Sequence, residues 1–454
     1  MTSAPSASES PVLKPRASWR ESMAVYLQPR VLIVLLLGFS SGLPLALSGS
    51  TLLVWMRESG VDLGTIGLFA LVGTPYTLKF LWAPLVDALQ VPLFTRRFGR
   101  RRGWLVFSQL LLIAAILLLA LTDPAKSPLF VALGALLVAA MSATQDIVVD
   151  AFRVESLPES EQAAGMASYV AAYRIGMLVS TAGVLFLVSG FESAGLARST
   201  AWMWGYVAMA AMVLLGTITA LAATEPEASA VAEAATRGES AFARVLKAAV
   251  GAFSEFLGRK DASAALAFVV LFKLTDAFSG TMTAPFVIDI GFTRNDYAAI
   301  VKGVGLAATL IGGFAGGFVA RRYSLAASLW IGAVLQALSN LAFAWLALVG
   351  VNQWALALAI TVENFTGAIG TVIFVAYLSA LCKNPLHTAT QYALLTALAA
   401  VGRTYLSAGA GYVAQATGWP VFFVISMAVA LPSLVLLLWL QRRGHFEALG
   451  PVRI

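Results

Sequence analysis

The feature that most constrains this chain is an apolar run of about 20 residues, the length that a helix needs to cross ~30 Å of hydrocarbon. Such a run recurs twelve times. Only 12% of the 454 residues are charged, so there are too few polar side chains to cover a water-soluble surface. The sequence therefore predicts an all-α polytopic membrane protein with twelve transmembrane helices. The expected spans are 31–54, 64–86, 104–121, 129–152, 165–190, 201–222, 263–287, 297–320, 325–348, 353–381, 388–414 and 419–440.

The distribution of lysine and arginine predicts the orientation of these helices. Twenty-one of the 30 basic residues fall in the tails and loops on one side of the membrane. Four basic residues fall on the other side, namely Arg57, Lys126, Arg198 and Arg294. Because cytoplasmic loops collect Lys and Arg, we expect both termini to be cytoplasmic.

The longest internal polar stretch follows the sixth span and divides the chain into two halves. We expect cytoplasmic tails over 1–30 and 441–454, six-helix bundles over 31–222 and 263–440, and a cytoplasmic linker over 223–262. Between 242 and 256, apolar side chains recur at helical spacing, which is typical of an amphipathic helix on the membrane surface. Residues 19–26 are a second candidate for such a helix, and residues 1–17 are expected to be disordered.

Composition excludes several functional classes. A net charge of +7 could suggest nucleic acid, but that partner requires one basic face, and here the basic residues sit in short loops. A single cysteine, Cys382, excludes an intrachain disulfide, and two histidines, His387 and His445, leave little for metal binding or catalysis. No phosphate-binding G-x-x-x-x-G-K-[ST] motif occurs. We therefore expect no enzyme activity, cofactor, metal or nucleic acid, and a monomer in contact with membrane lipid.

Ionisable residues inside the spans point to a cavity between helices. Each would cost roughly 2.5–3.5 kcal/mol at the bilayer centre, so most must face protein or water. They occupy spans 2, 4, 5, 7, 8, 10 and 11, whereas spans 3, 6, 9 and 12 carry none. Every third span in each half therefore lacks an ionisable residue. This pattern is typical of the major facilitator fold, in which two related bundles surround a central cavity. The nine residues are Lys79, Asp146, Asp150, Arg174, Lys273, Asp276, Lys302, Glu363 and Arg403.

The loop after the second span resembles a stretched form of the major facilitator motif Gly-x-x-x-Asp-(Arg/Lys)-x-Gly-(Arg/Lys)-(Arg/Lys). Here Ala83 replaces the motif glycine, and extra residues separate Asp87 from the arginines at 96–102. One interpretation is a conformational latch between the halves, formed by Asp87 with Arg100 and Arg101. The alternative is that these arginines only anchor the cytoplasmic side.

Asp146 and Asp150 are four residues apart, so they share one face of the fourth span. Two neighbouring carboxylates repel each other when both are ionised, which favours proton uptake and makes this pair the candidate proton-coupling site. The alternative is structural pairing of Asp146 with Arg174 and of Asp150 with Arg153. If neither acid carries the proton, Glu363 is the next candidate.

The remaining charges have competing interpretations. Lys273 and Asp276 are three apart and are expected to pair with each other, whereas Lys302 is expected to snorkel to the membrane surface. For Lys79, snorkelling and substrate binding are both open. Arg174, Glu363 and Arg403 lie deeper and are expected to line the cavity, although Arg403 could instead only neutralise Glu363. Glycines 312, 313, 316 and 317 are expected to permit close helix packing, and the G-x-S-x-G match at 38–42 is dismissed as a nucleophile motif because no strand precedes it.

Several stretches together resemble the AmpG muropeptide permease family. They are GFSSGLP at 38–44, KFLWAPLVD at 79–87, GRRRGW at 99–104, ATQDIVVDA at 143–151, EN at 363–364 with GT at 370–371 and FVA at 374–376, and TQYALL at 390–395 leading to VGR at 401–403. The resemblance runs in order from the first span to the eleventh.

The resemblance implies a proton-motive-force-dependent importer in the inner membrane of a Gram-negative bacterium. That family carries GlcNAc-1,6-anhydroMurNAc and its peptides from periplasm to cytoplasm for peptidoglycan recycling, and so supplies the signals that induce chromosomal β-lactamase. The sugars of such a substrate suit the amides Gln145, Asn364 and Gln391 and the aromatic walls Tyr173 and Tyr405. The stem-peptide carboxylates suit Lys79, Arg174, Lys273 and Arg403.

Other functions remain as alternatives. The related acetyl-coenzyme A transporters have motifs similar to those of the second and fourth spans, but the short loops of this chain argue against that function. A drug/proton antiporter would need a more apolar cavity with fewer basic residues. A membrane-embedded enzyme acting on lipid-linked sugars would need a loop carboxylate motif such as D-x-D, which the sequence lacks.

Overall fold

The computed structural model describes residues 24–226, 261–381 and 388–449, together with the single positions 243, 246, 250 and 258, and these ranges contain helices and no strand. We call 24–226 the N-terminal half and 261–449 the C-terminal half. The N-terminal half contains η1 (Val25–Leu27), α2 (Pro29–Leu47), α3 (Ser50–Glu58), α4 (Leu63–Leu68), η2 (Phe69–Gly73), α5 (Thr74–Leu78), η3 (Lys79–Leu81), α6 (Ala83–Ala88), α7 (Phe94–Phe98), α8 (Arg100–Ala120), α9 (Pro128–Ser156), α10 (Glu159–Leu178), η4 (Val179–Gly183), α11 (Val184–Ser193) and α12 (Arg198–Ala222).

The C-terminal half repeats this all-helical construction. It contains α15 (Ala262–Phe272), α16 (Leu274–Asp289), α17 (Arg294–Asp296), η5 (Tyr297–Val304), α18 (Gly305–Arg322), α19 (Leu325–Val349), α20 (Gln353–Leu381), α21 (Thr388–Tyr405), η6 (Leu406–Gly409), α22 (Ala410–Thr417), α23 (Trp419–Ala428), α24 (Leu431–Arg442) and α25 (His445–Leu449). The expected helices near 19–26 and 242–256, and the expected disorder of 1–17, fall largely or wholly outside the described residues.

Ten helices of the described chain are long and apolar enough to cross a membrane, at positions that match ten of the twelve predicted spans. The other two predicted spans, 64–86 and 388–414, are helical but interrupted. Proline stands at the start of both α5 and α6, where its missing N–H and fixed φ suit the first turn of a new helix. The 3-10 turn η6 separates α21 from α22. The count of twelve spans therefore stays a prediction at these two positions.

Glycines let particular helices approach each other closely. A Cβ at Gly38 would lie 2.6 Å from the carbonyl oxygen of Tyr169, and one at Gly42 would overlap the carbonyl oxygen of Tyr173, so α2 and α10 pack backbone to backbone. The G-x-S-x-G stretch is thus a packing motif of the small-xxx-small type.

The predicted glycine packing of α18 is correct for two of its four glycines. A Cβ at Gly312 would overlap the carbonyl oxygen of Phe365, and one at Gly316 would lie 3.0 Å from Ile369, both on α20. The prediction is wrong for Gly313 and Gly317, where a Cβ would meet no described atom within 4 Å. Each of these two glycines follows a contact glycine by one residue and therefore points about 100° away from it around the helix axis.

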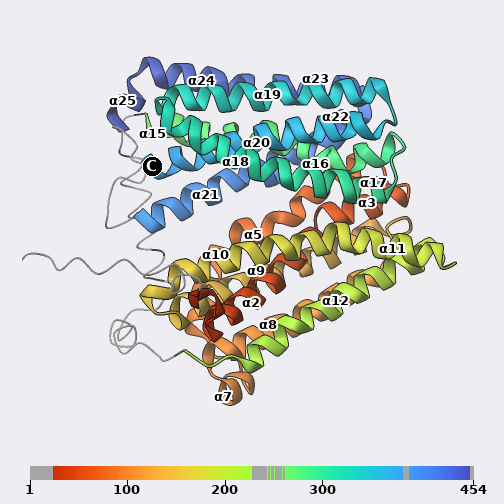
Figure 1. Ribbon diagram of the computed structural model, residues 1–454, viewed down its shortest axis with the longest axis vertical. Coiled ribbons are helices and arrows are strands. Elements are labelled where there is room, and N and C mark those ends of the chain that lie inside the picture. Colours follow the sequence, from red (N-terminus) through yellow and green to blue (C-terminus); the bar gives the residue numbers. More distant parts are fainter. Residues whose placement is uncertain are drawn as a thin grey trace, which may run out of the picture.

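The two halves meet at one end of the molecule. Figure 1 shows the C-terminal half above the N-terminal half, with the helices nearest to each other where α3 and α17 lie. Several elements of the N-terminal half contact elements of the C-terminal half. Helix α3 contacts α16, and α4 contacts α16, α22 and η6. The turn η2 contacts both α21 and η6, α5 contacts α21, α11 contacts α17, and η4 contacts η5. We call this end, which carries the 58–63, 193–198 and 289–294 connections, the distal end.

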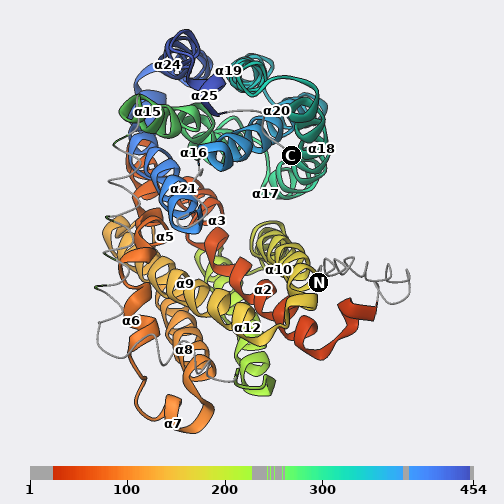
Figure 2. The same ribbon diagram turned by 90° about the vertical axis from the view of Figure 1, so that its left-hand side faces the viewer.

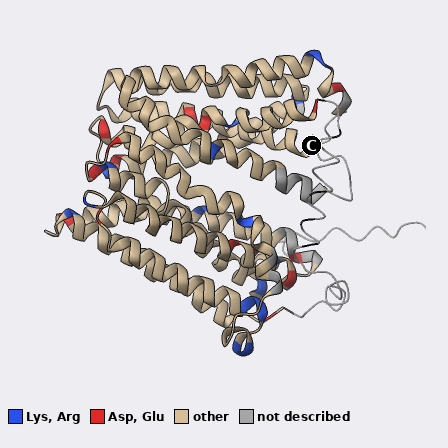
Figure 3. Ribbon diagram, turned by 180° about the vertical axis from the view of Figure 1, so that it is seen from behind, with Lys and Arg blue, Asp and Glu red and all other residues tan. Residues whose placement is uncertain are grey.

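The opposite end carries the first and last residues that the structure describes, Ala24 and Leu449, and we call it the terminal end. Viewed from this end, the two groups of helices stand apart, with α2, α9 and α10 in one and α16, α18 and α20 in the other (Figure 2). Lys and Arg gather at the terminal end near α7 and the start of α8, whereas both signs of charge are mixed at the distal end (Figure 3). Among the described residues, the extensive contacts between the halves therefore lie toward the distal end and along the interrupted helices.

Candidate functional site

Asp146 is the most enclosed acid of the predicted site. It lies on α9 with 7% of its surface exposed, and the Ser41 hydroxyl of α2 donates a hydrogen bond to its Oδ1. The Ser41 oxygen is also 3.3 Å from the hydroxyl of Tyr169 on α10. Three helices thus converge on one carboxylate, and their closeness follows from the glycines at 38 and 42. The sequence analysis missed Ser41 and Tyr169, although a serine between two packing glycines was a usable signal.

Asp150 lies one turn further along α9 in a different environment. Its side chain is 50% exposed, and its Oδ1 lies 3.6 Å from Nη2 of Arg153. The Arg153 guanidinium also stands 5.9 Å from the ring centre of Tyr169. Of the two alternative ion pairs expected from sequence, that of Asp150 with Arg153 is present. Asp146 instead has the Ser41 hydroxyl as its donor.

Lys79 and Gln145 lie near Asp146. Lys79 and Asp150 are the charged groups that act on Asp146, and both interpretations of Lys79, snorkelling and substrate binding, stay predictions. The indole of Trp82 donates to the hydroxyl of Thr144 at 3.2 Å and so fastens the interrupted second helix to α9. Gln145 is fully buried, and its amide atoms have no hydrogen-bond partner among the described residues. In this conformation Gln145 is not on a surface that a substrate could reach.

The two predicted carboxylate-binding arginines belong to opposite halves. Arg174 follows Tyr173 on α10, and Arg403 lies in the last turn of α21. Both arginines are exposed, although each lies within a helix of a predicted span. Next to Arg403, the hydroxyl oxygen of Thr404 lies 3.1 Å from the hydroxyl oxygen of Thr77, which belongs to the other half. Tyr405, the other predicted aromatic wall, is 37% exposed.

The C-terminal half has its own acid, Glu363, in a richer polar setting. Asn364 donates to Oε2 of Glu363 at 2.7 Å, and the Thr309 hydroxyl donates to Oδ1 of Asn364 at 3.1 Å. Asp276, Lys273 and Lys302 are the charged groups near enough to act on this carboxylate. The alternative in which Arg403 only neutralises Glu363 stays a prediction.

Lys273 and Asp276 form the ion pair expected from their spacing. The lysine Nζ lies 2.6 Å from Oδ2 of Asp276 and donates to the Thr371 hydroxyl at 3.0 Å. Lys302, which sequence reasoning set aside as a snorkelling residue, stands 5.2 Å from the ring centre of Tyr297 and acts on Glu363. Tyr297 lies at the distal start of η5, so the expected snorkelling of Lys302 stays a prediction. Depth in the sequence alone could not reveal which way the side chain turns.

At the terminal end, the arginines of the candidate latch contact carboxylates of their own half. Arg101 is buried and donates Nε and Nη2 to Glu155 at 2.9 and 2.5 Å, while Arg100 lies 3.7 Å from the same carboxylate. The backbone N–H groups of Arg101 and Arg102 donate to Glu225 at 2.8 and 2.9 Å. The side chains of Asp87 and Gln391 lie outside the described part of the structure, so the latch stays a prediction.

Comparison with known proteins gives independent evidence on the family of the chain. The Major Facilitator Superfamily model matches residues 34–404. An anhydromuropeptide permease of Escherichia coli is 40% identical over 417 residues, covering 92% of this chain and 80% of the relative. A putative transporter, AmpG 4, of Rickettsia felis is 34% identical and covers 91% of this chain and 97% of its own length.

Solved structures with low sequence identity share the fold. A POT family transporter in complex with a thioalcohol-conjugated peptide superposes with a TM-score of 0.66 at 13% identity, covering 91% of this chain and 96% of that one. The nucleoside transporter NupG superposes with a TM-score of 0.65 at 14% identity, covering 94% and 100%. These matches show the architecture of the chain and carry no information about its substrate.

Proposed function

The chain belongs to the Major Facilitator Superfamily and, within it, to the AmpG-type permeases, and from this premise we propose that it imports anhydromuropeptides with protons. The observation that carries the proposal is the 40% identity with an anhydromuropeptide permease over 92% of the chain. Such an importer would supply the cytoplasm with cell-wall fragments for recycling. An acetyl-coenzyme A transporter and a drug/proton antiporter have no comparable support.

The orientation follows from the charged loops. Lysine and arginine gather at the terminal end (Figure 3), and cytoplasmic loops carry an excess of these residues. We therefore assign the terminal end, with both termini, to the cytoplasm and the distal end to the periplasm of an inner membrane. In this assignment the structure corresponds to an inward-facing state, in which substrate would be released.

The substrate would bind between the halves, in contact with Arg174 and Arg403. Arg174 and Arg403 present exposed guanidinium groups from opposite halves, and guanidinium groups bind carboxylates through two parallel hydrogen bonds. A stem peptide supplies such carboxylates. Asn364, Gln391 and Tyr405 would contact the sugars, whereas the buried Gln145 would reach them only after the surrounding helices move.

The proton would be carried by Asp146. A nearly buried carboxylate is costly to keep ionised, and Asp146 has a hydroxyl rather than a cation as its hydrogen-bond donor. Protonation is therefore the low-cost way to carry this group through a transport cycle. Asp150 is half exposed and beside Arg153, which makes it a weaker candidate. Glu363 lies near Asp276 as well as the two lysines and is the next candidate.

Uptake into reconstituted vesicles tests the function. Vesicles with an inward proton gradient should accumulate labelled anhydromuropeptide above its external concentration, and a protonophore should abolish the accumulation. Protein-free vesicles are the control. Absence of accumulation, together with export of a cationic dye, would contradict the proposal and favour the antiporter.

A further inference from the structure

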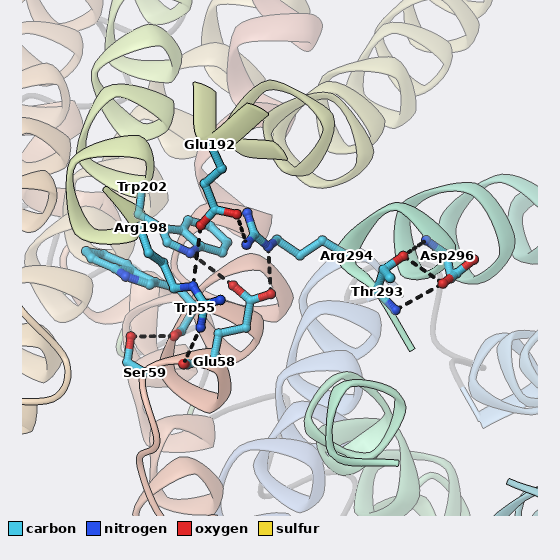
Figure 4. Close-up of polar contacts among 9 residues, drawn as sticks. All are labelled: Trp55, Glu58, Ser59, Glu192, Arg198, Trp202, Thr293, Arg294 and Asp296. Carbon is cyan, nitrogen blue, oxygen red and sulfur yellow. Dashed lines mark hydrogen bonds and ion pairs between the residues drawn. The ribbon is translucent and has the colours of Figure 1, made fainter. Parts of the chain in front are cut away.

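At the distal end, one arginine joins the two halves through two carboxylates. Arg294, at the start of α17, extends between Glu58 and Glu192 (Figure 4). Its Nε donates to Oε1 of Glu58 at 2.6 Å, and its Nη2 donates to Oε2 of Glu192 at 2.5 Å. Glu58 is the last residue of α3, and Glu192 lies in the last turn of α11. A single guanidinium of the C-terminal half therefore ties down two helices of the N-terminal half.

The surroundings strengthen this contact. The side chains of Arg294 and Glu58 are only 7% and 11% exposed. The indole of Trp202 donates to Oε2 of Glu58 at 3.1 Å, and its ring lies 5.7 Å from the Arg294 guanidinium. Charge interactions are stronger where water is excluded, and removing one partner of a buried pair leaves an uncompensated charge. Separating the halves here requires both carboxylates to lose the same buried cation.

The position of Arg294 is fixed by the backbone around it. Thr293 and Asp296 form a capping box at the start of α17, with the Thr293 N–H donating to Asp296 at 3.0 Å and the Asp296 N–H donating to Thr293 at 3.1 Å. Gln353 of α20 donates to the other oxygen of Asp296 at 2.7 Å. Because this turn is held by the C-terminal half itself, the arginine is presented to the N-terminal half by a rigid support.

A second pair joins the halves nearby but is more exposed. Arg57 of α3 forms an ion pair with Asp289 of α16, and the two side chains are 22% and 25% exposed. Asp289 also accepts a hydrogen bond from the Trp419 indole at 2.5 Å. Exposed pairs contribute less than buried ones, so this pair is the weaker of the two connections.

We propose that these residues, namely Arg294 with Glu58, Glu192 and Trp202, and Arg57 with Asp289, form the lock that holds the two halves together at the distal end. Opening this lock is the step that exposes the central site to the distal side. The proposal rests on the proposed function only for assigning the distal end to the periplasm. It does not depend on which substrate is carried.

Accessibility of a single cysteine in intact cells tests the lock. In a Cys382→Ser background, Ala298→Cys places a reporter one turn after Arg294, where the side chain is 1% exposed and η5 contacts η4 of the other half. Labelling by a membrane-impermeant maleimide should be slow in the parent and about tenfold or more faster with Arg294→Ala, because the population open at the distal end rises. Arg57→Ala should give a smaller increase.

Two controls separate the lock from other causes. Ala194→Cys, in the exposed distal connection, should label at one rate in every background; its failure to label would refute the assigned orientation and not the lock. Lys126→Ala removes a distal cation that pairs within its own loop, with Asp123 at 3.1 Å, and should leave reporter labelling unchanged. An equal increase with Lys126→Ala would overturn the proposal.

The weaker pair keeps the test decisive if Arg294→Ala does not reach the membrane. Arg57→Asp should speed reporter labelling by placing two carboxylates together, and the exchange Arg57→Asp with Asp289→Arg should return it toward the parental rate. Labelling that stays unchanged or slows in Arg294→Ala and in Arg57→Asp would show that these residues do not hold the distal end closed.

Discussion

Asp146 in the N-terminal half and Glu363 in the C-terminal half are both candidates for carrying the proton, and the two acids are stabilised differently. Asp146 in the N-terminal half is 7% exposed and accepts its hydrogen bond from the Ser41 hydroxyl. Glu363 in the C-terminal half is bound by Asn364 at 2.7 Å and interacts with Lys273, Asp276 and Lys302. With all four groups ionised, the C-terminal set has no net charge.

The difference indicates a division of labour between the halves. Asp146 is the more enclosed of the two acids, and a buried carboxylate with a neutral hydroxyl as its donor is costly to keep ionised, even with Lys79 nearby. We therefore propose that the N-terminal half carries the proton and that the polar groups around Glu363 contact the substrate. The following predictions are ordered from the largest expected effect to the smallest.

Asp146→Asn should have the largest effect. The amide keeps the shape of the side chain and an acceptor for Ser41 but cannot take up a proton, so accumulation of anhydromuropeptide above its external concentration should be lost while the protein stays folded in the membrane. Asp150→Asn is the matched control one turn away, and it should retain accumulation because Asp150 is half exposed and paired. Equal loss in both variants would erase the distinction between the two acids.

Gly42→Ala should disturb the N-terminal site through packing alone. The added methyl group would overlap the Tyr173 carbonyl oxygen, which forces α2 and α10 apart at a cost of about 1–3 kcal/mol and moves Ser41 away from Asp146. The thermal unfolding temperature in detergent and the uptake rate should both fall. Gly313→Ala, where no described atom lies within 4 Å, should leave both unchanged. Similar effects from the two glycines would refute the close approach of α2 and α10.

Arg403→Lys should change selectivity more than overall activity. Lysine keeps the charge but cannot form two parallel hydrogen bonds to a carboxylate. We expect kcat/KM for a tripeptide-bearing substrate to fall roughly tenfold, equivalent to about 1.4 kcal/mol, and a smaller fall for the peptide-free disaccharide. Uptake measured side by side with both substrates checks this, and an equal fall for both would assign Arg403 to a structural role.

Glu363→Gln should have the smallest effect on coupling and a visible effect on stability. It leaves Lys302 without one of its balancing charges, which should cost about 1–3 kcal/mol of stability, measured by thermal unfolding in detergent. The double change Glu363→Gln with Lys302→Gln should recover part of that loss, because removing both charges is less costly than leaving one unpaired. No recovery would show that the lysine does not balance Glu363.

The all-helical membrane fold was predictable from the sequence, because the length of an apolar run and the placement of charges are properties of a whole helix. Local irregularities within a helix do not change them. The resemblance carried by 143–151 and 363–376 predicted the permease family in the same way. The predicted continuity of spans 64–86 and 388–414 was not met, because turns near Pro75, Pro84 and Gly409 interrupt the helices.

The polar contacts were harder to foresee because they join residues far apart in sequence. The pair of Lys273 with Asp276 was predictable, since spacing along one helix fixes it. The hydrogen bond from Ser41 to Asp146 and the ion pairs of Arg294 with Glu58 and Glu192 join residues that are far apart in the chain. Their proximity in the fold cannot be read from a single sequence. Glu58 and Glu192 were overlooked because both lie just beyond the predicted spans, where a charged residue needs no explanation.

Proton movement measured directly tests the central claim, that the proton enters with the muropeptide on Asp146. Addition of anhydromuropeptide to weakly buffered proteoliposomes should make the external medium more alkaline with the wild-type chain and with Glu363→Gln, and should cause no pH change with Asp146→Asn. A wild-type pH change in Asp146→Asn, or its loss in Glu363→Gln alone, would contradict the assignment of the proton to the N-terminal half.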